Sequence, residues 1–384
     1  MAWRRRDVDV ERRPMRIGLV IGMLAQGGAE FQLMTLATGL TERGHDVRVF
    51  AYDGASEFDD RLRAAGVTVE TAEARNRVQK LRLVRAWLRR GQFDVVHGFM
   101  NLASSLTLLA RFPQRRPAVI ATDYATATYL RHHPLLRAAL MTFALADRVV
   151  TESELNRANL ERLVPWLRGR CVVVRNGLDP MRFAPQPAAV RNDPGTFRFC
   201  VVGTVHEPKN PLRVVDAVAE LVRRQERGFR VDWYGRLSGT PGSREGEEAR
   251  ERAADAGVTE YIAFHGATSD VVEAYRRADA LLHAAIREGF PNAVAEAMAC
   301  GLPVLVSRVS DLPLVVETAR NGFVFDERDP SAIADAMAAV MRMRPEERAA
   351  MGRRSRELAV TWFSMDRFFA EHEAMYAAVA RVRP

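Results

Sequence analysis

Two carboxylates with seven residues between them, Glu288 and Glu296, stand in the stretch of the chain that is richest in reactive groups. Gly289-Phe290-Pro291 follows the first as a turn. Pro291 is predicted to begin a helix, because its φ angle is preset and it has no N–H to leave unpaired. The helix is expected to end at Gly301, where a left-handed cap costs little. Glu288 is therefore placed on the loop before a helix, and Glu296 in its second turn.

The start of this predicted helix is suited to binding an anion. The backbone N–H groups of Asn292 and Ala293 lie at the positive end of the helix dipole, which favours a phosphate. Glu296 stands among apolar neighbours, so its carboxylate is expected to be buried and to need hydrogen-bond donors, which two ribose hydroxyls would supply. The alternative for both acids is a solvated surface position. The apolar neighbours are Val294, Ala295, Ala297 and Met298.

A lysine follows a second predicted strand. Lys209 stands in a loop that begins at Gly203 and Thr204. An ammonium group there can neutralise the negative charge that builds on a departing diphosphate. The alternative is a surface lysine near a helix start, where a cation is mildly unfavourable. That cost favours the functional interpretation.

A pair of glycines, Gly27 and Gly28, follows the first predicted strand and opens a helix. Glycines at such a position let the backbone approach a ligand closely. The loop is therefore predicted to touch a diphosphate donor or an acceptor, and a tight strand-to-helix turn is the alternative.

Short apolar runs rich in Val and Ile alternate with amphipathic segments, which favours βαβ units and parallel sheets. A proline-rich stretch, residues 176–195, separates two series of such runs and is interpreted as a linker. We therefore predict two doubly wound α/β domains that face one cleft, with ligands beyond the carboxyl ends of the strands. Strands are predicted near 16–22, 47–51, 67–70, 94–97, 118–122, 147–151, 171–174, 197–202, 230–234, 261–264, 279–283 and 303–306.

Five landmarks, in order, resemble the retaining nucleotide-sugar glycosyltransferases of family four, which have the GT-B fold of two Rossmann-like domains facing a central cleft. Glu288 and Glu296 resemble the Glu-x7-Glu signature of that family. The resemblance runs from about residue 16 to about residue 360. The other landmarks are Gly27-Gly28-Ala29-Glu30 with Arg43-Gly44-His45, Asn176-Gly177-Leu178-Asp179, the loop from Gly203 through Lys209-Asn210, and Asn321-Gly322 followed by Asp329-Pro330.

The resemblance implies a domain organisation. Residues 15–184 are expected to form an acceptor-side N-terminal domain, and residues 185–361 a C-terminal domain that binds the nucleotide sugar. Residues 362–384 are expected to form a C-terminal helix that returns toward the N-terminal domain. Residues 1–14 are expected to be a disordered extension.

The resemblance also implies the roles of the site residues. Glu288 would contact sugar hydroxyls or support the transition state, and Lys209 would stabilise the leaving diphosphate, so these two are the predicted catalytic residues. Glu296 would hold the ribose. The β-phosphate of the donor would take the acceptor proton, and neither a metal nor a cofactor is expected. The other predicted donor-binding positions are Gly27, Gly28, Gly203, Thr204, Arg236, Gly289, Phe290, Pro291, Asn292 and Ala293.

The chain departs from the family pattern on both sides of the expected cleft. An arginine often follows the loop glycine in the family, but Thr204 stands here, and Arg236 or Arg287 is the candidate replacement. Many relatives carry a histidine after the strand near 118–122, where this chain has Asp123 and Tyr124.

These two residues and His97, at the end of the preceding strand, are the candidate acceptor contacts. For His97, a plain hydrogen-bonded position is the alternative.

Positive charge is concentrated in the first half of the chain. The formal net charge is +8, of which residues 1–184 contribute +10 and the remainder −2. Segment 75–90 has seven basic residues, no acid and an apolar helical stripe, so it is predicted either to dock on anionic lipid or to bury the stripe in the core. Nucleic acid is not expected as a partner, because no aromatic stacking pattern or reader motif accompanies the charge. The stripe is Leu81, Val84, Trp87 and Leu88.

The three cysteines form no Cys-x-x-Cys pair or Cys/His cluster, which disfavours a zinc site or a disulfide framework and suits a reducing cytosol. The apolar run 17–25 follows several arginines but is interpreted as a buried strand rather than a signal peptide. No run approaches the roughly 20 apolar residues of a spanning helix. The expected location is the cytoplasm, at the inner membrane surface if the basic half docks there.

Together these features predict a retaining glycosyltransferase that moves a sugar from a nucleotide diphosphate sugar to a hydroxyl of a lipid-linked or saccharide acceptor, in polysaccharide or glycolipid biosynthesis. Two alternatives stay open: a sugar-nucleotide epimerase of similar architecture, and a catalytically degenerate protein that only binds nucleotide. A glycosidase is disfavoured, because its two acids would lie on opposite sides of the scissile bond rather than on one loop-helix unit.

Overall fold

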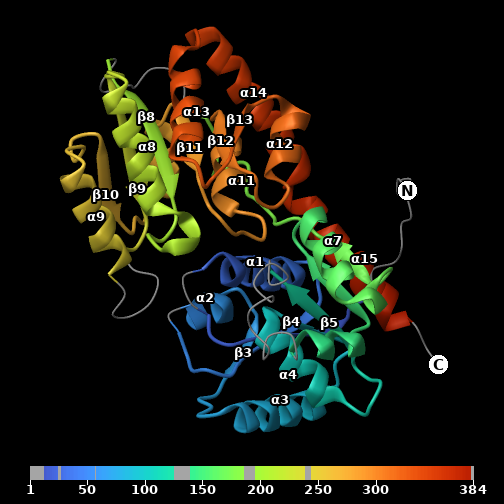
Figure 1. Ribbon diagram of the computed structural model, residues 1–384. Helices are drawn as coiled ribbons and strands as arrows, with labels where there is room; N and C mark the ends of the chain where they lie inside the picture. The colour runs from blue at the N-terminus through green and yellow to red at the C-terminus, as the bar shows by residue number, and fades with distance from the viewer. Residues whose placement is uncertain are drawn as a thin grey trace. The chain divides into compact units, whose positions relative to one another are not determined.

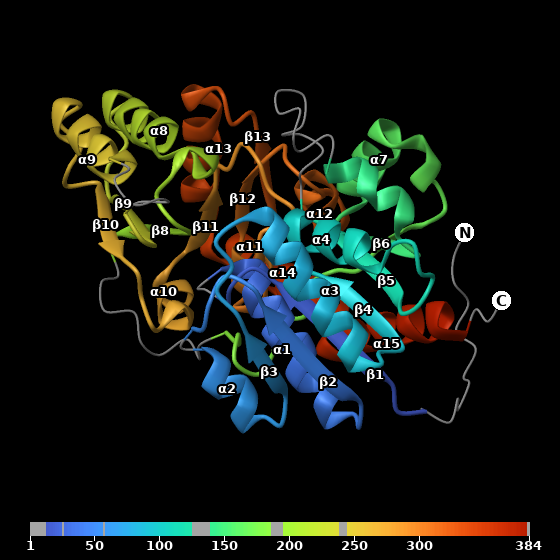
Figure 2. The same ribbon diagram turned by 90° about the horizontal axis from the view of Figure 1, so that it is seen from below.

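The computed structural model describes residues 13–24, 27–56, 58–124, 139–185, 195–237 and 244–381, which form two compact units (Figures 1 and 2). The first unit comprises the described residues through Thr122, those of 139–149, and those from Glu373 onward. The second comprises Asp123, Tyr124 and the described residues from Val150 to His372. Most of the predicted N-terminal extension lies outside the described residues.

The first parallel sheet has the strand order β3-β2-β1-β4-β5-β6-β7. Strands β2 and β3 therefore lie on one side of β1, and β4 to β7 lie on the other, so the strand order reverses beside β1. In open parallel sheets ligands bind at the carboxyl edge near such a reversal. Each of the seven strands predicted for this half lies within two residues of an observed one: β1 Arg16–Ile21, β2 Asp46–Ala51, β3 Thr68–Thr71, β4 Val95–Gly98, β5 Ala118–Asp123, β6 Arg148–Thr151 and β7 Cys171–Val173.

The apolar stripe of the basic segment is part of the core of the first unit. Trp87 is 1% exposed and stacks on Phe50 with ring centroids 5.3 Å apart. A Cβ at Gly18 of β1 would lie 2.8 Å from the Trp87 ring, so the strand needs a glycine here. This settles the stripe in favour of the core. The helices of the unit are α1 Gly28–Glu42, α2 Phe58–Ala64, α3 Arg77–Gly91, α4 Asn101–Arg111 and the short η2 Thr142–Leu145.

The C-terminal helix α15 (Met365–Arg381) contributes its last turns to the first unit. Glu373 lies 3.3 Å from the ring of His45, which stands just before β2. Tyr376 is fully buried and its hydroxyl lies 2.8 Å from His97 Nδ1 at β4. The end of the chain therefore helps to close the core that its beginning builds.

The second parallel sheet has the order β10-β9-β8-β11-β12-β13, which again reverses beside the first strand of the series. Five of its strands match the predicted positions. The sixth, β13, whose four residues begin at Gly322, was not predicted. The strands are β8 Phe197–Val202, β9 Phe229–Tyr234, β10 Ile262–Gly266, β11 Ala280–His283, β12 Val304–Ser307 and β13 Gly322–Phe325.

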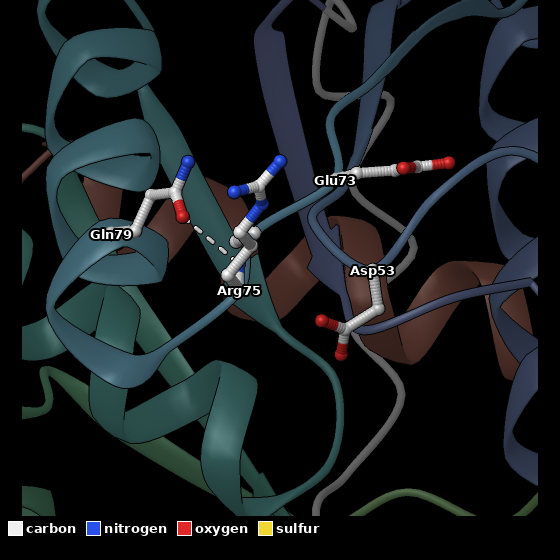
Figure 3. Close-up of a pocket in the computed structure, with 5 residues that line it drawn as sticks. Asp53, Glu73, Arg75 and Gln79 are labelled. Atoms are coloured by element: carbon white, nitrogen blue, oxygen red, sulfur yellow. Dashed lines mark hydrogen bonds between the residues drawn. The ribbon is translucent and has the colours of Figure 1, made fainter.

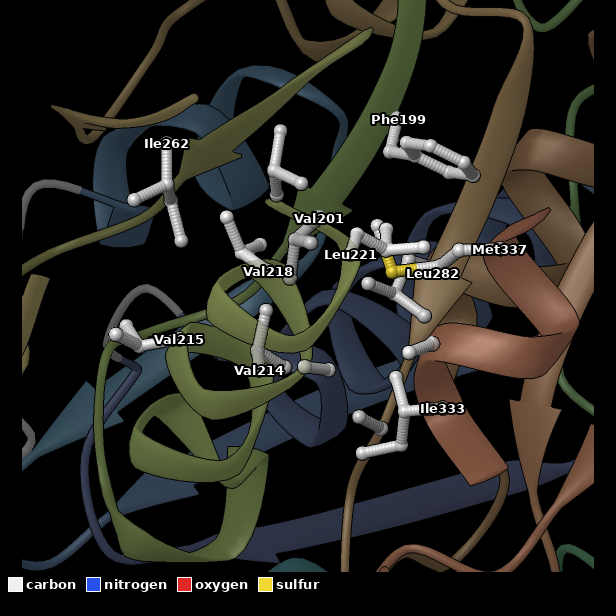
Figure 4. Packing of buried hydrophobic residues seen from close by; sticks show 14 of the residues in the cluster. Phe199, Val201, Val214, Val215, Val218, Leu221, Ile262, Leu282, Ile333 and Met337 are labelled. Atoms are coloured by element: carbon white, nitrogen blue, oxygen red, sulfur yellow. The ribbon is translucent and has the colours of Figure 1, made fainter. Parts of the chain in front are cut away.

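Helices cover both faces of the second sheet. On one face, α8 and α13 pack on the strands through Val214, Leu221 and Met337, all completely buried (Figure 4). On the other face, α10, α11, α12 and α14 contribute to a second apolar cluster. The helices of the unit are α7 Glu154–Leu163, η3 Pro165–Leu167, η4 Glu207–Lys209, α8 Pro211–Arg223, α9 Glu245–Asp255, α10 Val271–Arg277, α11 Asn292–Ala299, α12 Leu312–Ala319, α13 Pro330–Arg342 and α14 Pro345–Trp362.

The compact units divide the chain at different places from the predicted 15–184 and 185–361. Segment 150–184 groups with the second unit. Its helix α7 begins against α12, because the Asp311 carboxylate accepts hydrogen bonds from the N–H groups of Glu154 and Leu155 at 2.9 and 3.0 Å. Part of the predicted linker, residues 186–194, lies outside the described residues.

Gly352 of α14 packs directly against the end of α11 in the second unit. A Cβ at this position would lie 2.0 Å from the carbonyl oxygen of Gly301, just beyond the end of α11. We expect Gly352→Ala to lower the free energy of unfolding by about 1–3 kcal/mol through overpacking, measured by denaturant unfolding. In an ordinary helix the same change stabilises by about 1 kcal/mol.

Ala349→Gly on the exposed side of α14 is the matched control. It is expected to destabilise only by the helix propensity difference, about 0.5–1 kcal/mol. A stabilised Gly352→Ala protein would contradict the packing seen between α14 and the end of α11.

Candidate active site

The loop after β8 carries the predicted cation. The carbonyl oxygen of Gly203 accepts a hydrogen bond from the indole N–H of Trp233 at 2.8 Å. A Cβ at Gly235 would lie only 1.9 Å from that same oxygen, so the loops after β8 and β9 meet backbone to backbone. Gly203 itself has φ of +145° and faces the Lys209 side chain, 2.9 Å from where its own Cβ would lie. The positive φ angle favours glycine here, and a larger residue would displace the end of the Lys209 side chain.

A second set of bonds ties this loop to the segment after β11. The side-chain amide of Asn210 donates to the carbonyls of Ala284 and Glu327 at 3.1 and 2.7 Å. The N–H of Ile286 donates to the carbonyl of Pro208 at 2.9 Å. Lys209 lies between these anchors, so its ammonium group is held beside the loop that carries Glu288.

The Lys209 ammonium and a Glu288 carboxylate oxygen form an ion pair, in which each side chain is 18% exposed. His283, at the end of β11, is 2% exposed, and its Nε2 lies 3.6 Å from that oxygen, with no hydrogen-bond partner in the described part of the chain. Burial and, secondly, the charge of Lys209 hold the pKa of His283 well below its ordinary value. The imidazole is therefore neutral, and Lys209 is the charged partner of Glu288.

Glu296 lies on α11, eight residues after Glu288, as the sequence predicted. One of its carboxylate oxygens accepts a hydrogen bond from the hydroxyl of the fully buried Tyr275 at 2.8 Å. Burial raises the pKa of Glu296, and the hydrogen bond from Tyr275 partly offsets that rise. Tyr275 was missed from the sequence, because a tyrosine in an amphipathic helix is indistinguishable from a core residue.

The helix α11 begins one residue later than predicted. Pro291 is its N-cap, with ψ of 115°, and Asn292 is the first helical residue. The end of the helix is as predicted, with Gly301 at φ of +81°.

The turn before α11 is held by the segment that follows β6. The Glu152 carboxylate, 7% exposed, accepts a hydrogen bond from the N–H of Phe290 at 3.0 Å. The Asn156 amide donates to the carbonyl of Gly289 at 3.3 Å, and the Ser310 hydroxyl donates to the same carbonyl. Glu152 was not identified from the sequence, because Thr151-Glu152-Ser153 has the composition of an ordinary helix start.

The remaining donor-side candidates lie at the edge of this arrangement. Thr204 is half-buried, and Arg236 is exposed, with its carbonyl accepting from the N–H of Val205 at 2.7 Å. Arg287, the other candidate replacement for the missing arginine, pairs with Glu207 at 2.6 Å.

The acceptor-side candidates separate into two groups. Tyr124 lies next to the donor-side turn, with its Cα 3.8 Å from the place that a Cβ at Gly289 would take. Asp123 is completely buried and close enough to raise the pKa of Glu152. His97 is 1% exposed, and its second ring nitrogen lies 2.6 Å from the Thr122 hydroxyl. Its position is that of a buried, hydrogen-bonded core residue, the alternative given for it.

The glycine loop of the first unit opens α1 as expected. Gly27 is the N-cap of the helix, in extended conformation, and Gly28 is the first helical residue. A Cβ at Gly27 would lie 2.2 Å from a carboxylate oxygen of Glu30, which folds back over the helix start.

At the carboxyl ends of β2 and β3, a cavity of about 570 Å³ is lined by Asp53, Glu73, Arg75 and Gln79 (Figure 3). Among the described residues, no three His, Cys, Asp or Glu side chains gather as a metal site would require.

Two family models match consecutive parts of the chain. The model described as Glycosyltransferase Family 4 matches residues 26–182, and the model described as Glycosyl transferases group 1 matches residues 184–358. The two glycosyltransferase models together match residues 26–358 apart from residue 183.

Curated relatives and solved structures agree with these models. The D-inositol 3-phosphate glycosyltransferase of Saccharomonospora viridis is 31% identical over 289 residues, which cover 70% of this chain and 66% of that protein. The phosphatidyl-myo-inositol mannosyltransferase of Propionibacterium freudenreichii is 29% identical over 91% of each chain. The crystal structure of HepE from Anabaena in complex with UDP and glucose superposes with a TM-score of 0.82 at 17% identity, covering 95% of this chain and 100% of that one.

The ion pair between Lys209 and Glu288 can be measured by a double-mutant cycle of Lys209→Met and Glu288→Gln. Since both side chains are largely removed from water, we expect a coupling free energy of about 1–3 kcal/mol from denaturant unfolding. Arg244 and Glu247 form the matched control, with side chains 64% and 65% exposed. Their coupling is expected to be about 0.5 kcal/mol or less. Equal coupling in the two cycles would mean that the site pair is as solvated as a surface pair.

Proposed function

This chain belongs to glycosyltransferase family four, and we propose that it transfers a sugar from a nucleotide diphosphate sugar to a hydroxyl of an acceptor, with retention at the anomeric carbon. The observation that carries the proposal is the convergence of Lys209, Glu288 and the first residues of α11 within one compact unit. It provides a cation, a hydrogen-bonding acid and a helix N-terminus at one place.

The donor diphosphate would bind between Lys209 and the start of α11. The N–H groups of Asn292 and Ala293 belong to the first turn of that helix and suit phosphate oxygens. A diphosphate would compete with Glu288 for the Lys209 ammonium. That exchange would release the carboxylate to accept hydrogen bonds from hydroxyls of the donor sugar.

Glu296 would hold the ribose. Tyr275 occupies one carboxylate oxygen, and the other is left to accept from a ribose hydroxyl. Because the carboxylate is shielded from water, each such bond is stronger than it would be on the surface.

The chemical step replaces one bond at the anomeric carbon by another on the same face. The bond from that carbon to the β-phosphate oxygen breaks, and the acceptor oxygen forms the new bond. The acceptor proton passes to the β-phosphate, so no protein base is needed. Lys209 and the α11 dipole stabilise the charge that grows on the leaving diphosphate, the task that a metal ion would otherwise perform.

The acceptor is proposed to be a polyhydroxylated molecule with an acidic group. The cavity beyond β2 and β3 offers carboxylates for hydroxyls and, in Arg75, a guanidinium for an anion. Lys80 lies beside it, 2.5 Å from Asp53. Two of the relatives are named for inositol phosphate and phosphatidyl-inositol acceptors, which have this chemistry.

The proposed donor grip is tested by nucleotide release from a panel of UDP-, GDP- and ADP-sugars. We expect Lys209→Ala and Glu296→Ala each to lower kcat/KM about a hundredfold, since each removes a charged contact to the donor. Arg244→Ala, on the exposed start of α9, is the control and should leave the rate unchanged.

Near-normal rates in both site variants would refute the assignment of the donor site. Isomerised sugar nucleotide without transfer would indicate the epimerase, and saturable binding without turnover would indicate a degenerate binding protein.

The apolar stripe of α3 packs in the core, so we propose that docking on anionic lipid would use only the exposed basic side chains of α3 and not the stripe. Arg82 and Arg89 of α3 are exposed, and Arg85 donates to the carbonyls of Ala110 and Phe112 at 3.0 and 2.6 Å. Phe112 is 56% exposed, so an apolar side chain lies beside these cations. Among the described helices, none has the length and hydropathy of a membrane span.

Liposome sedimentation tests this surface. We expect the protein to sediment with vesicles that contain anionic lipid, and Arg82→Glu with Arg89→Glu to lower the bound fraction several-fold, at about 1 kcal/mol per cation near the surface. Arg223→Glu with Arg244→Glu makes the same charge change in the second unit and should retain binding. Sedimentation that is indifferent to lipid charge would exclude the docking surface.

A further inference from the structure

Glu152 is a buried acid that the proposed chemistry does not use, and it stands at the donor site. It follows β6 directly and is 7% exposed. Its Oε2 accepts the hydrogen bond from the N–H of Phe290, and a Cβ at Gly289 would lie 2.2 Å from the same oxygen. The carboxylate thus fills the space that the absent side chain of Gly289 leaves open.

Glu152 also reaches the first residue of α11. It is hydrogen-bonded to the side chain of Asn176, whose amide donates to the Asn292 side-chain oxygen at 2.7 Å. The contacts therefore flank Pro291 on both sides, at Phe290 directly and at Asn292 through Asn176. All of these residues belong to the second unit.

We propose that Glu152 is a positioning residue of the donor site, which fixes the turn from Glu288 to Pro291 and the first residue of α11 in the arrangement that binds the donor diphosphate. This inference rests on the proposed function, because that function says what the turn binds. The hydrogen bonds that hold the turn are independent of the proposed function. Three residues separate Glu288 from the first helical residue, Asn292, and the N–H of the middle one, Phe290, donates to Glu152. A hydrogen bond at the centre of the turn restrains both Glu288 before it and the start of α11 after it.

The surroundings of Glu152 oppose its ionisation. Its pKa is raised to about 7, chiefly by burial and also by the carboxylates of Glu288 and Asp123, against the lowering effect of the hydrogen bonds from Asn176 and Phe290. The start of α7, which follows Glu152 in the chain, contacts a further acid, Asp311 at the start of α12. Its carboxylate accepts hydrogen bonds from the N–H groups of Glu154 and Leu155 and lies 3.7 Å from the Arg175 guanidinium.

The raised pKa of Glu152 makes the stability of the protein depend on pH. Because the folded-state pKa lies above the unfolded value near 4.5, ionisation of Glu152 destabilises the folded state. This destabilisation is absent below pH 4.5, grows as the pH rises and is complete above pH 7. In contrast, the ionised carboxylate is the stronger acceptor for the N–H of Phe290. The same charge that costs stability therefore tightens the turn.

The test uses the full-length protein with Glu152→Gln, Glu152→Ala and the control Glu154→Gln, whose exposed side chain pairs with Arg157 on the same helix. Thermal unfolding is followed at pH 5 and pH 8. We expect Glu152→Gln to raise Tm relative to wild type, and by more at pH 8 than at pH 5. The control should show no such pH-dependent gain.

Donor kinetics are measured over the same pH range. Glu152→Ala is expected to raise the donor KM about tenfold or more, with kcat less affected, since the loss of one charge-assisted hydrogen bond corresponds to at least that factor. Wild-type kcat/KM should fall between pH 8 and pH 6, and Glu152→Gln should lack this inflection.

Wild-type donor KM and an unchanged pH profile in both Glu152 variants would overturn the proposal. If Glu152→Ala does not fold, the pH profile and Tm of Glu152→Gln decide. Calorimetry with UDP, GDP and ADP separates this outcome from failure of the proposed function. A wild-type protein that binds none of the three nucleotides refutes the function, whereas equal affinity in wild type and variants refutes only the role of Glu152.

Discussion

The pairing of one ammonium group with one carboxylate, Lys209 with Glu288, is the contact on which the candidate site depends. The chain has 56 cationic side chains, and only Lys80 and Lys209 are lysines. An ammonium is a compact point charge on a flexible stem, whereas a guanidinium prefers a fixed planar partner. A lysine can therefore exchange a carboxylate for a phosphate with little rearrangement. The neutral His283 beside the pair leaves that exchange to the ammonium alone.

The parallel sheet explains how such a pair can be assembled from residues far apart in sequence. Lys209 and Glu288 follow β8 and β11, which are neighbours in the sheet although two strands intervene in the chain. The strand order reverses between them, and in open parallel sheets ligands bind at the carboxyl edge beside such a reversal. The close backbone contact between Gly203 and Gly235 restrains the loop that carries Lys209. Packing of the core thus determines the geometry of the charged pair.

Much of this arrangement follows from sequence because its signals are local. Strands with apolar runs, the Glu288 and Glu296 spacing and the Gly301 cap each depend on neighbours within a few residues. The positions that sequence did not identify depend on contacts across the fold. Glu152 and Tyr275 acquire their importance from Phe290 and Glu296, which are 138 and 21 residues away in the chain. The apolar stripe containing Trp87 suited both lipid and core, and its packing against Phe50 and Gly18, far away in the sequence, decided between them.

The site contains ionisable groups whose charged forms are disfavoured in the folded protein. Burial raises the pKa values of Glu152 and Glu296 and lowers that of His283, so each group has lost favourable hydration. Hydrogen bonds from Tyr275, Phe290 and Asn176 return only part of that loss. An apolar residue in place of Glu152 would avoid the free-energy cost of burying an acid. It would, however, leave the N–H of Phe290 without this acceptor and the turn free to shift. In the proposed function a diphosphate would meet a helix start and an ammonium at fixed distances, so order in the turn would offset the stability that the buried acid removes.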